Sequence, residues 1–278
     1  MLPDALFLNV HMYGIMVAVG ILFAFGVIVW YGKKLAVPEK TVDFVFYDGI
    51  LAVLVGFGAA ALFQALYEYI ENPEKGFHIS GSITFLGGLL GGAACFLLGY
   101  LLWHKKLPAG KGMRDMFTIL PCSITVAHGF GRIGCFFAGC CYGKVTDSWL
   151  GVKFPRLPQP VHPTQLYEAA FLFILFAVLS WLVLTKKGKF NFPIYMMAYG
   201  VFRFAIEYLR DDDRGAWIGS LTPSQFWSVV MVLGGIGLLV WFILRDKREA
   251  AAADTPNEEE DVPAEESPAA EKTDGEDK

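Results

Sequence analysis

Charged residues are scarce in this chain of 278 residues. They make up 18% of the sequence, whereas hydrophobic residues make up 55%, and the mean hydropathy is +0.46. A soluble globular domain carries about 25% charged residues and fewer apolar ones. The composition therefore excludes an ordinary soluble domain and indicates a protein that lies largely in a membrane.

Cysteine is also rare, and a secretory leader is not expected. Five cysteines at irregular spacings are too few for a disulfide scaffold. The segment from Met1 to Asp4 lacks the basic residues that precede the apolar part of a cleavable signal peptide. The first apolar run is therefore expected to remain in the membrane.

The net charge of −4 hides an uneven distribution. Twelve of the 27 acidic residues follow Arg248, where only two lysines oppose them, so residues 1–248 hold 15 acidic and 21 basic residues. A basic, apolar body suits an anionic bilayer, and no nucleic-acid partner is expected. The remainder, 249–278, has few apolar residues and is predicted to be a disordered acidic tail in the cytoplasm.

Apolar segments of helical length recur seven times within residues 1–248. They lie near 12–31, 46–70, 83–103, 115–134, 167–185, 192–209 and 222–244. Each approaches the ~20 residues that a helix needs to cross a bilayer. The predicted fold is an all-α integral membrane protein with seven transmembrane helices, and 1–248 is its single membrane domain.

Basic residues are concentrated after the first, third, fifth and seventh of these segments. The 13 residues on that side are Lys33, Lys34, Lys40, Lys105, Lys106, Lys111, Arg114, Lys186, Lys187, Lys189, Arg245, Lys247 and Arg248. The positive-inside rule places this side in the cytoplasm. The N-terminus and the loop 135–166 are therefore predicted to lie outside, and the C-terminus in the cytoplasm.

The stretch 128–143 concentrates the residues that can carry chemistry: one histidine, one arginine, three cysteines and five glycines. His128 and Arg132 are four residues apart and share a helix face. An arginine at the edge of an apolar segment needs a partner or an anionic ligand. A helix break between Gly134 and Gly139 is expected to leave free backbone N–H groups near Arg132. Together these features predict an anion site at the membrane surface.

A second basic pair lies in the segment 192–209. Arg203 and Arg210 are seven residues apart, and Tyr199 and Glu207 lie on the same helix face. One interpretation is an ion-pair ladder in which Glu207 neutralises both arginines. Another is that the guanidinium groups bind a lipid phosphate, because their planar fork donates two parallel hydrogen bonds. The two interpretations are compatible.

The cysteines of the central stretch allow three interpretations. Cys135 and Cys140 could form a disulfide, since the neighbours Cys140 and Cys141 rarely bridge. All three could bind a metal with His128, although the spacing fits no familiar site. They could also be reactive thiols activated by Arg132. A structural role is favoured, and neither a metal nor another cofactor is predicted.

Four motifs occur in order between Tyr13 and Arg210. They are Tyr13-Gly14; Gly131-Arg132-Ile133-Gly134 with Phe136, Gly139 and Gly143; His162-Pro163-Thr164-Gln165-Leu166-Tyr167-Glu168; and Tyr199-Gly200-Val201-Phe202-Arg203-Phe204 with Glu207 and Arg210. On these motifs the chain resembles the bacterial prolipoprotein diacylglyceryl transferases. The resemblance implies a multi-pass enzyme of the bacterial plasma (inner) membrane.

The resemblance also implies a reaction and a set of site residues. A diacylglyceryl group would move from phosphatidylglycerol to the lipobox cysteine thiol of a prolipoprotein signal peptide, with release of glycerol phosphate. The expected catalytic residues are Arg203 and Tyr13, from the resemblance, and His128 as the base, from its position one turn before Arg132; the alternative is that His128 is only a helix-end histidine bonded to a backbone carbonyl. The expected substrate-binding residues are Arg132, Arg210, Gly143, Cys135, Gln165 and Glu168.

The chain departs from the family pattern at four positions. Leu86 stands where the family has a histidine, Cys135 where it usually has asparagine, and Cys140 where it often has glutamate. The pair Gly58-Ala59 stands in place of a Gly-Arg pair. These departures favour an alternative: a divergent membrane thiol-redox or lipid-binding protein that kept the scaffold and lost the transfer reaction.

Overall fold

The computed structural model describes residues 11–79, 84–108, 111–185, 187–210 and 221–253. Within these ranges the chain forms seven α-helices and four short 3-10 helices, and its only β-contacts are isolated bridges. The predicted all-α class is therefore confirmed.

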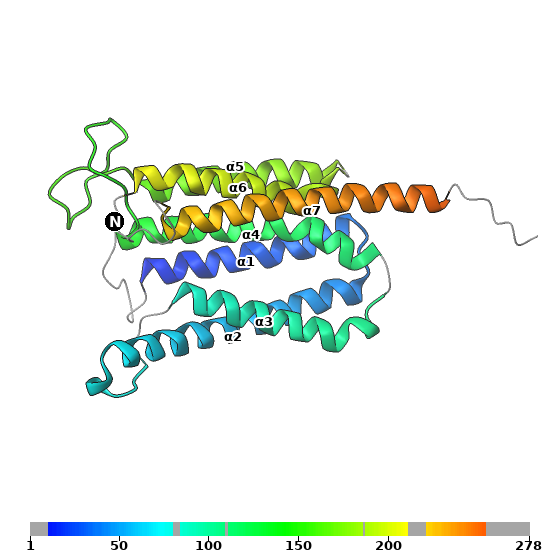
Figure 1. The fold of residues 1–278 in the computed structure, drawn as a ribbon, viewed down its shortest axis with the longest axis horizontal. Helices are drawn as coiled ribbons and strands as arrows, with labels where there is room; N and C mark the ends of the chain where they lie inside the picture. Colours follow the sequence, from blue (N-terminus) through cyan, green and yellow to red (C-terminus); the bar gives the residue numbers. More distant parts are fainter. Residues whose placement is uncertain (1–10, 80–83, 109–110, 186, 211–220, 254–278) are drawn as a thin grey trace, which may run out of the picture. The chain divides into compact units, whose positions relative to one another are not determined.

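The α-helices correspond to the seven apolar segments of the sequence. They are α1 (Met12–Lys34), α2 (Glu39–Glu71), α3 (Phe85–Trp103), α4 (Lys111–Ala138), α5 (Thr164–Leu184), α6 (Asn191–Ile206) and α7 (Pro223–Ala253). The 3-10 helices are η1 (Pro73–Lys75), η2 (His104–Lys106), η3 (Gly188–Phe190) and η4 (Glu207–Leu209). Figure 1 labels the seven α-helices and colours them in the order of the sequence.

Six of the described α-helices are long and apolar enough to cross a membrane. The exception is α6, which has 16 residues and continues into η4. This segment contains Arg203 and Glu207, so the charges that dilute its apolar character are those of the candidate site. The structure supports a multi-pass membrane protein with six candidate spans.

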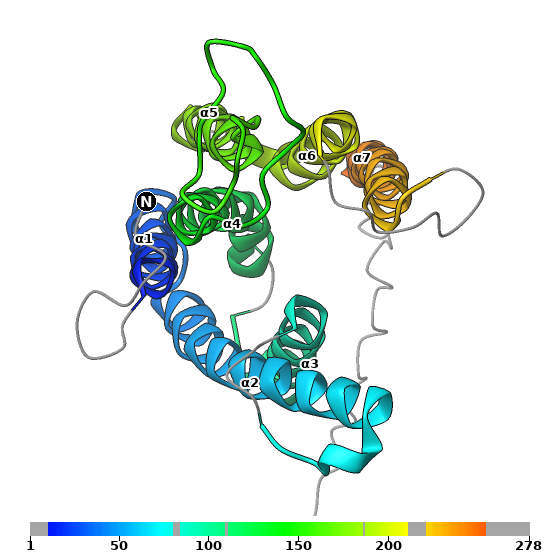
Figure 2. The same ribbon diagram turned by 90° about the vertical axis from the view of Figure 1, so that its left-hand side faces the viewer.

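Helices pack in pairs where small residues let their backbones approach. A Cβ at Gly20 of α1 would lie 2.9 Å from the carbonyl oxygen of Ala127 in α4. In α2 and α3, a Cβ at Gly56 would lie 3.0 Å from the carbonyl oxygen of Gly88. The small residues of α3 therefore allow close packing against α2. Viewed along the helices, α4 lies between α1 and α5 (Figure 2).

A buried polar side chain fixes the start of α6 against α4 and α5. The amide of Asn191 is fully buried and donates to the carbonyl oxygens of Thr118 at 3.0 Å and Leu179 at 3.1 Å. Around it, Met116, Ile119 and other apolar residues of α1, α4, α5 and α6 form the core. The three helices that carry the candidate site are thereby held in register.

The last helix extends beyond the predicted end of the membrane domain. It runs to Ala253, five residues past Arg248, so the predicted disorder from residue 249 is wrong for 249–253. An ion pair of 2.7 Å between Arg245 and Glu249, at i,i+4 spacing, and a run of alanines favour this extension. The rest of the predicted tail, 254–278, lies outside the described residues. The chain divides into two compact units, Met1–Leu239 and Val240–Lys278.

Candidate active site

A buried carboxylate from α5 gathers polar side chains from α4 and α6. Glu168, which is 1% exposed, accepts a hydrogen bond from the Tyr199 hydroxyl at 2.8 Å. The same oxygen, Oε1, lies 3.0 Å from Nη2 of Arg132. Glu168 therefore neutralises the arginine that the sequence marked as needing a partner.

The ring of His128 faces the same carboxylate. Its Nε2 lies 3.6 Å from Oε1 of Glu168, and its ring packs edge-on against Tyr199 with centroids 5.2 Å apart. His128 and Arg132 thus lie on one face of α4, as their spacing predicts.

This first network keeps unused hydrogen-bonding capacity. The Nε of Arg132 and the Oε2 of Glu168 are buried and have no hydrogen-bond partner. Buried polar atoms are nearly always satisfied, so such atoms in a site indicate a ligand or water. The free N–H of Arg132 is a donor suited to an anion.

A second carboxylate, Glu207 in η4, binds both remaining arginines. Its Oε2 lies 2.6 Å from Nη1 of Arg203 and 3.9 Å from Nε of Arg210. Its Oε1 accepts a hydrogen bond of 2.9 Å from Thr222. The predicted ion-pair ladder is therefore confirmed. Tyr199, which shares the face of Arg203 in sequence, binds Glu168 instead.

The start of α7 completes this second network. The side chain of Ser224 accepts a hydrogen bond of 2.8 Å from Nη2 of Arg203. Thr222 and Gln225 form the reciprocal capping bonds that their spacing indicates: the Thr222 N–H donates to Gln225 at 3.1 Å, and the Gln225 N–H donates to Thr222 at 3.3 Å. The contribution of Ser224 to the site was not predicted, because it joins helices 21 residues apart in the sequence.

The two networks lie near one another. Arg203 interacts electrostatically with His128 and Tyr199 of the first network. The guanidinium groups of Arg132, Arg203 and Arg210 thus converge with the carboxylates of Glu168 and Glu207 among the described residues. Inside an apolar bundle, guanidinium groups suit an anionic group better than a neutral one.

The break after α4 takes a form that the sequence did not predict. Gly139 has φ of 68°, and its N–H donates to the carbonyl of Phe136 at 3.1 Å. The N–H of Cys140 donates to the carbonyl of Cys135 at 3.2 Å, which completes a Schellman cap. These two backbone N–H groups are therefore used within the helix end, and the expectation that they are free for an anion is wrong.

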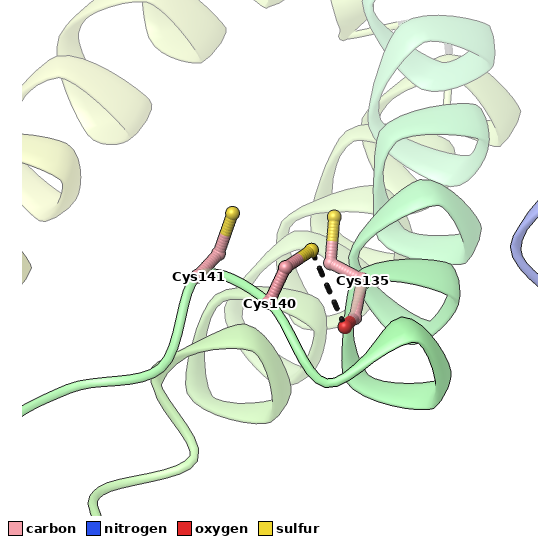
Figure 3. Close-up of side chains that lie close together, drawn as sticks. All are labelled: Cys135, Cys140 and Cys141. Carbon is pink, nitrogen blue, oxygen red and sulfur yellow. Dashed lines mark hydrogen bonds between the residues drawn. The ribbon is translucent and has the colours of Figure 1, made fainter. Parts of the chain in front are cut away.

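This cap folds Cys140 back over the last turn of α4. The thiols of Cys135, Cys140 and Cys141 are free, and their sulfur atoms all lie within 4.8 Å of one another. Figure 3 shows the three side chains pointing to the same side of the turn. The Cys135–Cys140 disulfide, one of the three interpretations of the sequence, is not formed in the structure, and His128 is not part of the group.

Cys141 has an unusual backbone and a polar environment. Its φ of 63° is rare for a residue other than glycine, and Thr164 holds its carbonyl with a hydrogen bond of 2.8 Å. Hydrogen bonds from the thiols of Cys135 and Cys140, and then the guanidinium of Arg210, lower the pKa of the Cys141 thiol. The turn therefore brings a thiol to the arginines.

Gln165 supports the same turn from α5. Its side chain is 1% exposed, and its amide donates to the carbonyl of Cys140 at 2.5 Å. The sequence predicted direct substrate contact for Gln165. In the structure this side chain holds the cysteine turn, and its substrate contact stays a prediction.

Gly143 packs against protein. Its N–H donates to the carbonyl of His162 at 2.8 Å, and it forms a bridge with Arg210. A Cβ at this position would collide with the carbonyl oxygen of Leu209 and would lie 2.8 Å from the side chain of Thr164. Glycine is therefore needed here because three protein segments converge, and the predicted approach to a lipid headgroup stays a prediction.

Tyr13 approaches the site from α1. Its ring lies against Gly134, where a Cβ would come within 3.1 Å of Cδ2 of Tyr13. Tyr13 interacts electrostatically with Arg132 and with all three thiols of the turn. Leu86 lies in the first turn of α3, and its side chain is outside the described part of the structure.

The fold and the site define a multi-pass helical membrane protein with a buried, basic polar centre that can hold an anionic group. A family model described as "Prolipoprotein diacylglyceryl transferase" matches residues 3–241. The chain belongs to the prolipoprotein diacylglyceryl transferase family, and it is a transferase.

Related proteins match this chain along nearly their whole length. The chain is 34% identical over 249 residues to the phosphatidylglycerol–prolipoprotein diacylglyceryl transferase of Clostridium tetani (87% of this chain, 96% of the relative). It is 32% identical to transferase 2 of Clostridium perfringens (87% and 94%) and 33% identical to the enzyme of Pseudomonas paraeruginosa (88% and 94%).

Proposed function

We propose that this chain transfers a diacylglyceryl group from phosphatidylglycerol to the lipobox cysteine thiol of a prolipoprotein, the first step of lipoprotein biosynthesis. The observation that carries the proposal is the convergence of Arg132, Arg203 and Arg210 around two buried carboxylates. Phosphatidylglycerol has one anionic phosphate, and guanidinium N–H groups are donors suited to it. The relatives' names support the same pair of substrates.

The arginines act on the leaving group. The acceptor thiolate attacks the glycerol carbon of the diacylglyceryl group, and the bond from this carbon to the phosphate oxygen breaks. Negative charge grows on the departing glycerol phosphate, so donors already aimed at the phosphate lower the barrier. Glu168 and Glu207 hold these donors in place, and the unpartnered Nε of Arg132 supplies a hydrogen bond to the phosphate.

The acceptor thiol must lose a proton, since a free thiol is largely protonated near neutral pH. His128 is the candidate base, because its ring lies on the Arg132 face and within 3.6 Å of Glu168. Tyr13 lies on α1 against Gly134 near the end of α4. Cys135, Gln165 and Gly143 act through the turn that follows α4.

Seven spans, an outer N-terminus and a cytoplasmic C-terminus are part of the proposal, with α6 and η4 together crossing the bacterial inner membrane. The distribution of basic residues supports this orientation. A reporter fused after Arg248 should then be cytoplasmic, and one inserted near Val152 should lie outside. Two reporters on the same side would exclude this topology.

A second candidate is a lipid-binding or thiol-redox protein without transferase activity. Leu86 in place of the family histidine, together with the free thiols of the turn, favours it. Genetic complementation distinguishes the candidates. Expression of this chain should restore lipoprotein lipidation in bacteria depleted of their own transferase, and the Arg203→Lys variant should not. Failure of the wild-type chain, at matched membrane levels, would favour the second candidate.

A further inference from the structure

The cysteine turn has the composition and compactness of a metal site. Three sulfur atoms lie within 4.8 Å of one another, and no fourth His, Cys, Asp or Glu joins them among the described residues. A tetrahedral zinc ion with Zn–S bonds of ~2.3 Å needs sulfur atoms about 3.8 Å apart. The thiols are therefore within about 1 Å of the arrangement that zinc requires.

Several interactions outside the thiols themselves build this arrangement. The Schellman cap at Gly139 brings Cys140 over Cys135, with Sγ of Cys140 3.6 Å from the carbonyl oxygen of Cys135. Thr164 and Gln165 hold the carbonyls of Cys141 and Cys140 from α5. These contacts explain why the side chains point to the same side, as Figure 3 shows.

The surroundings suit an anionic metal cluster. Three thiolates around one divalent zinc ion leave one negative charge. Arg210 interacts electrostatically with Cys141, and Arg132 interacts electrostatically with Cys135 and Cys141. The same arginines are the proposed phosphate ligands, so the sulfur of an acceptor thiol bound to zinc would lie beside the departing glycerol phosphate.

We propose that Cys135, Cys140 and Cys141 bind one zinc ion whose fourth position takes the acceptor thiol; this inference rests on the proposed function. Three protein ligands with one open position are the pattern of catalytic zinc sites. A thiol that binds zinc does so as the thiolate and releases its proton to solvent. The zinc ion thereby activates the acceptor thiol, and it takes over the role of base that the proposed function gives to His128.

The step balances without a redox partner. The acceptor thiol binds zinc and releases one proton. Its sulfur then forms a bond to the glycerol carbon, while the bond from that carbon to the phosphate oxygen breaks. The electron pair of that bond leaves on glycerol phosphate, and zinc keeps its oxidation state. This role accounts for a chain with Leu86 in place of the family histidine but with Cys135 and Cys140 in place of the family's asparagine and glutamate.

Metal content and cobalt spectroscopy test the site directly. Full-length protein is purified without chelator, and zinc is measured by mass spectrometry for the wild type and for Cys135→Ser, Cys140→Ser and Cys141→Ser. Cys95→Ser is the matched control, because Cys95 lies in α3 outside the cluster. The wild type and the control should hold one zinc per chain, and each cluster variant should lose at least tenfold in zinc affinity.

Cobalt in place of zinc reports the fourth ligand. A lipobox peptide with cysteine should add a thiolate-to-cobalt charge-transfer band, and the same peptide with serine should not. Zinc content no higher in the wild type than in Cys140→Ser would overturn the proposal, as would a Cys135–Cys140 disulfide in the isolated protein or a spectrum that the peptide leaves unchanged. Transfer by zinc-free protein would refute the metal and leave the proposed function intact. Zinc and peptide binding without transfer would refute the function and leave the site.

Discussion

Glu168 carries the most demanding electrostatic role in the structure, so Glu168→Gln is the variant that tests the first network best. The carboxylate is 1% exposed, lies 3.0 Å from Arg132 and accepts the Tyr199 hydroxyl at 2.8 Å. The amide keeps the shape and loses the charge, which leaves Arg132 unpaired in the bundle. Breaking a buried pair in this way costs about 3–5 kcal/mol.

The matched control is Tyr199→Phe. It removes one hydrogen bond to the same carboxylate and leaves the ion pair intact. A hydrogen bond to a charged group contributes about 1.5–3 kcal/mol. Glu168→Gln should therefore lower the free energy of unfolding by roughly 2 kcal/mol more than Tyr199→Phe does. Reversible unfolding in mixed detergent micelles, followed by circular dichroism, measures the difference.

The same unfolding experiment, repeated with added phosphatidylglycerol, measures how much this lipid stabilises each protein. The unpaired Arg132 of Glu168→Gln gains most from an anionic headgroup, so this lipid should stabilise the variant more than the wild type. A zwitterionic lipid should not. Equal losses in the two variants would refute the idea that Glu168 neutralises Arg132, and equal stabilisation of variant and wild type by phosphatidylglycerol would refute the idea that Arg132 binds a lipid phosphate.

Four further predictions concern separate parts of the site. Arg203→Lys keeps the charge but loses the fork that joins Glu207 and Ser224, so kcat should fall at least tenfold while circular dichroism stays unchanged; full activity would make Arg203 structural. Gly143→Ala forces the turn away from the carbonyl of Leu209 and should lower both thermal stability and activity; a neutral effect would refute the convergence argument. His128→Gln should abolish transfer, but spare lipid binding, if His128 is the base, whereas an unchanged rate would assign proton removal elsewhere. Truncation after Arg248 should leave membrane insertion and activity intact, and loss of either would give residues 249–278 a role.

Sequence patterns were sufficient for the helices and for local pairs. Each apolar segment became a helix because its length and composition leave the backbone no other way to satisfy its hydrogen bonds in a bilayer. The ladder of Arg203, Glu207 and Arg210 follows from spacing within one segment. The capping bonds between Thr222 and Gln225 are local in the same sense.

Residue spacing could not predict contacts between segments that are far apart in the sequence. Glu168 pairs with Arg132 and Tyr199 because α4, α5 and α6 lie side by side, and no periodicity reveals that register. The hydrogen bonding of the cysteine turn was predicted wrongly for another reason. The backbone N–H groups after α4 would be free only if the helix ended without a cap, and the left-handed conformation of Gly139 allows a Schellman cap that uses them.

The central claim is that one phosphatidylglycerol molecule is divided between a thiol and a released headgroup. Phosphatidylglycerol that is labelled with one isotope in its acyl chains and another in its headgroup glycerol is incubated with purified protein and a lipobox peptide. The acyl label should appear on the peptide in a thioether, and the headgroup label should appear as glycerol phosphate in equal amount, while a serine peptide yields neither. The absence of both products, under conditions in which the Clostridium tetani relative forms them, would contradict the account.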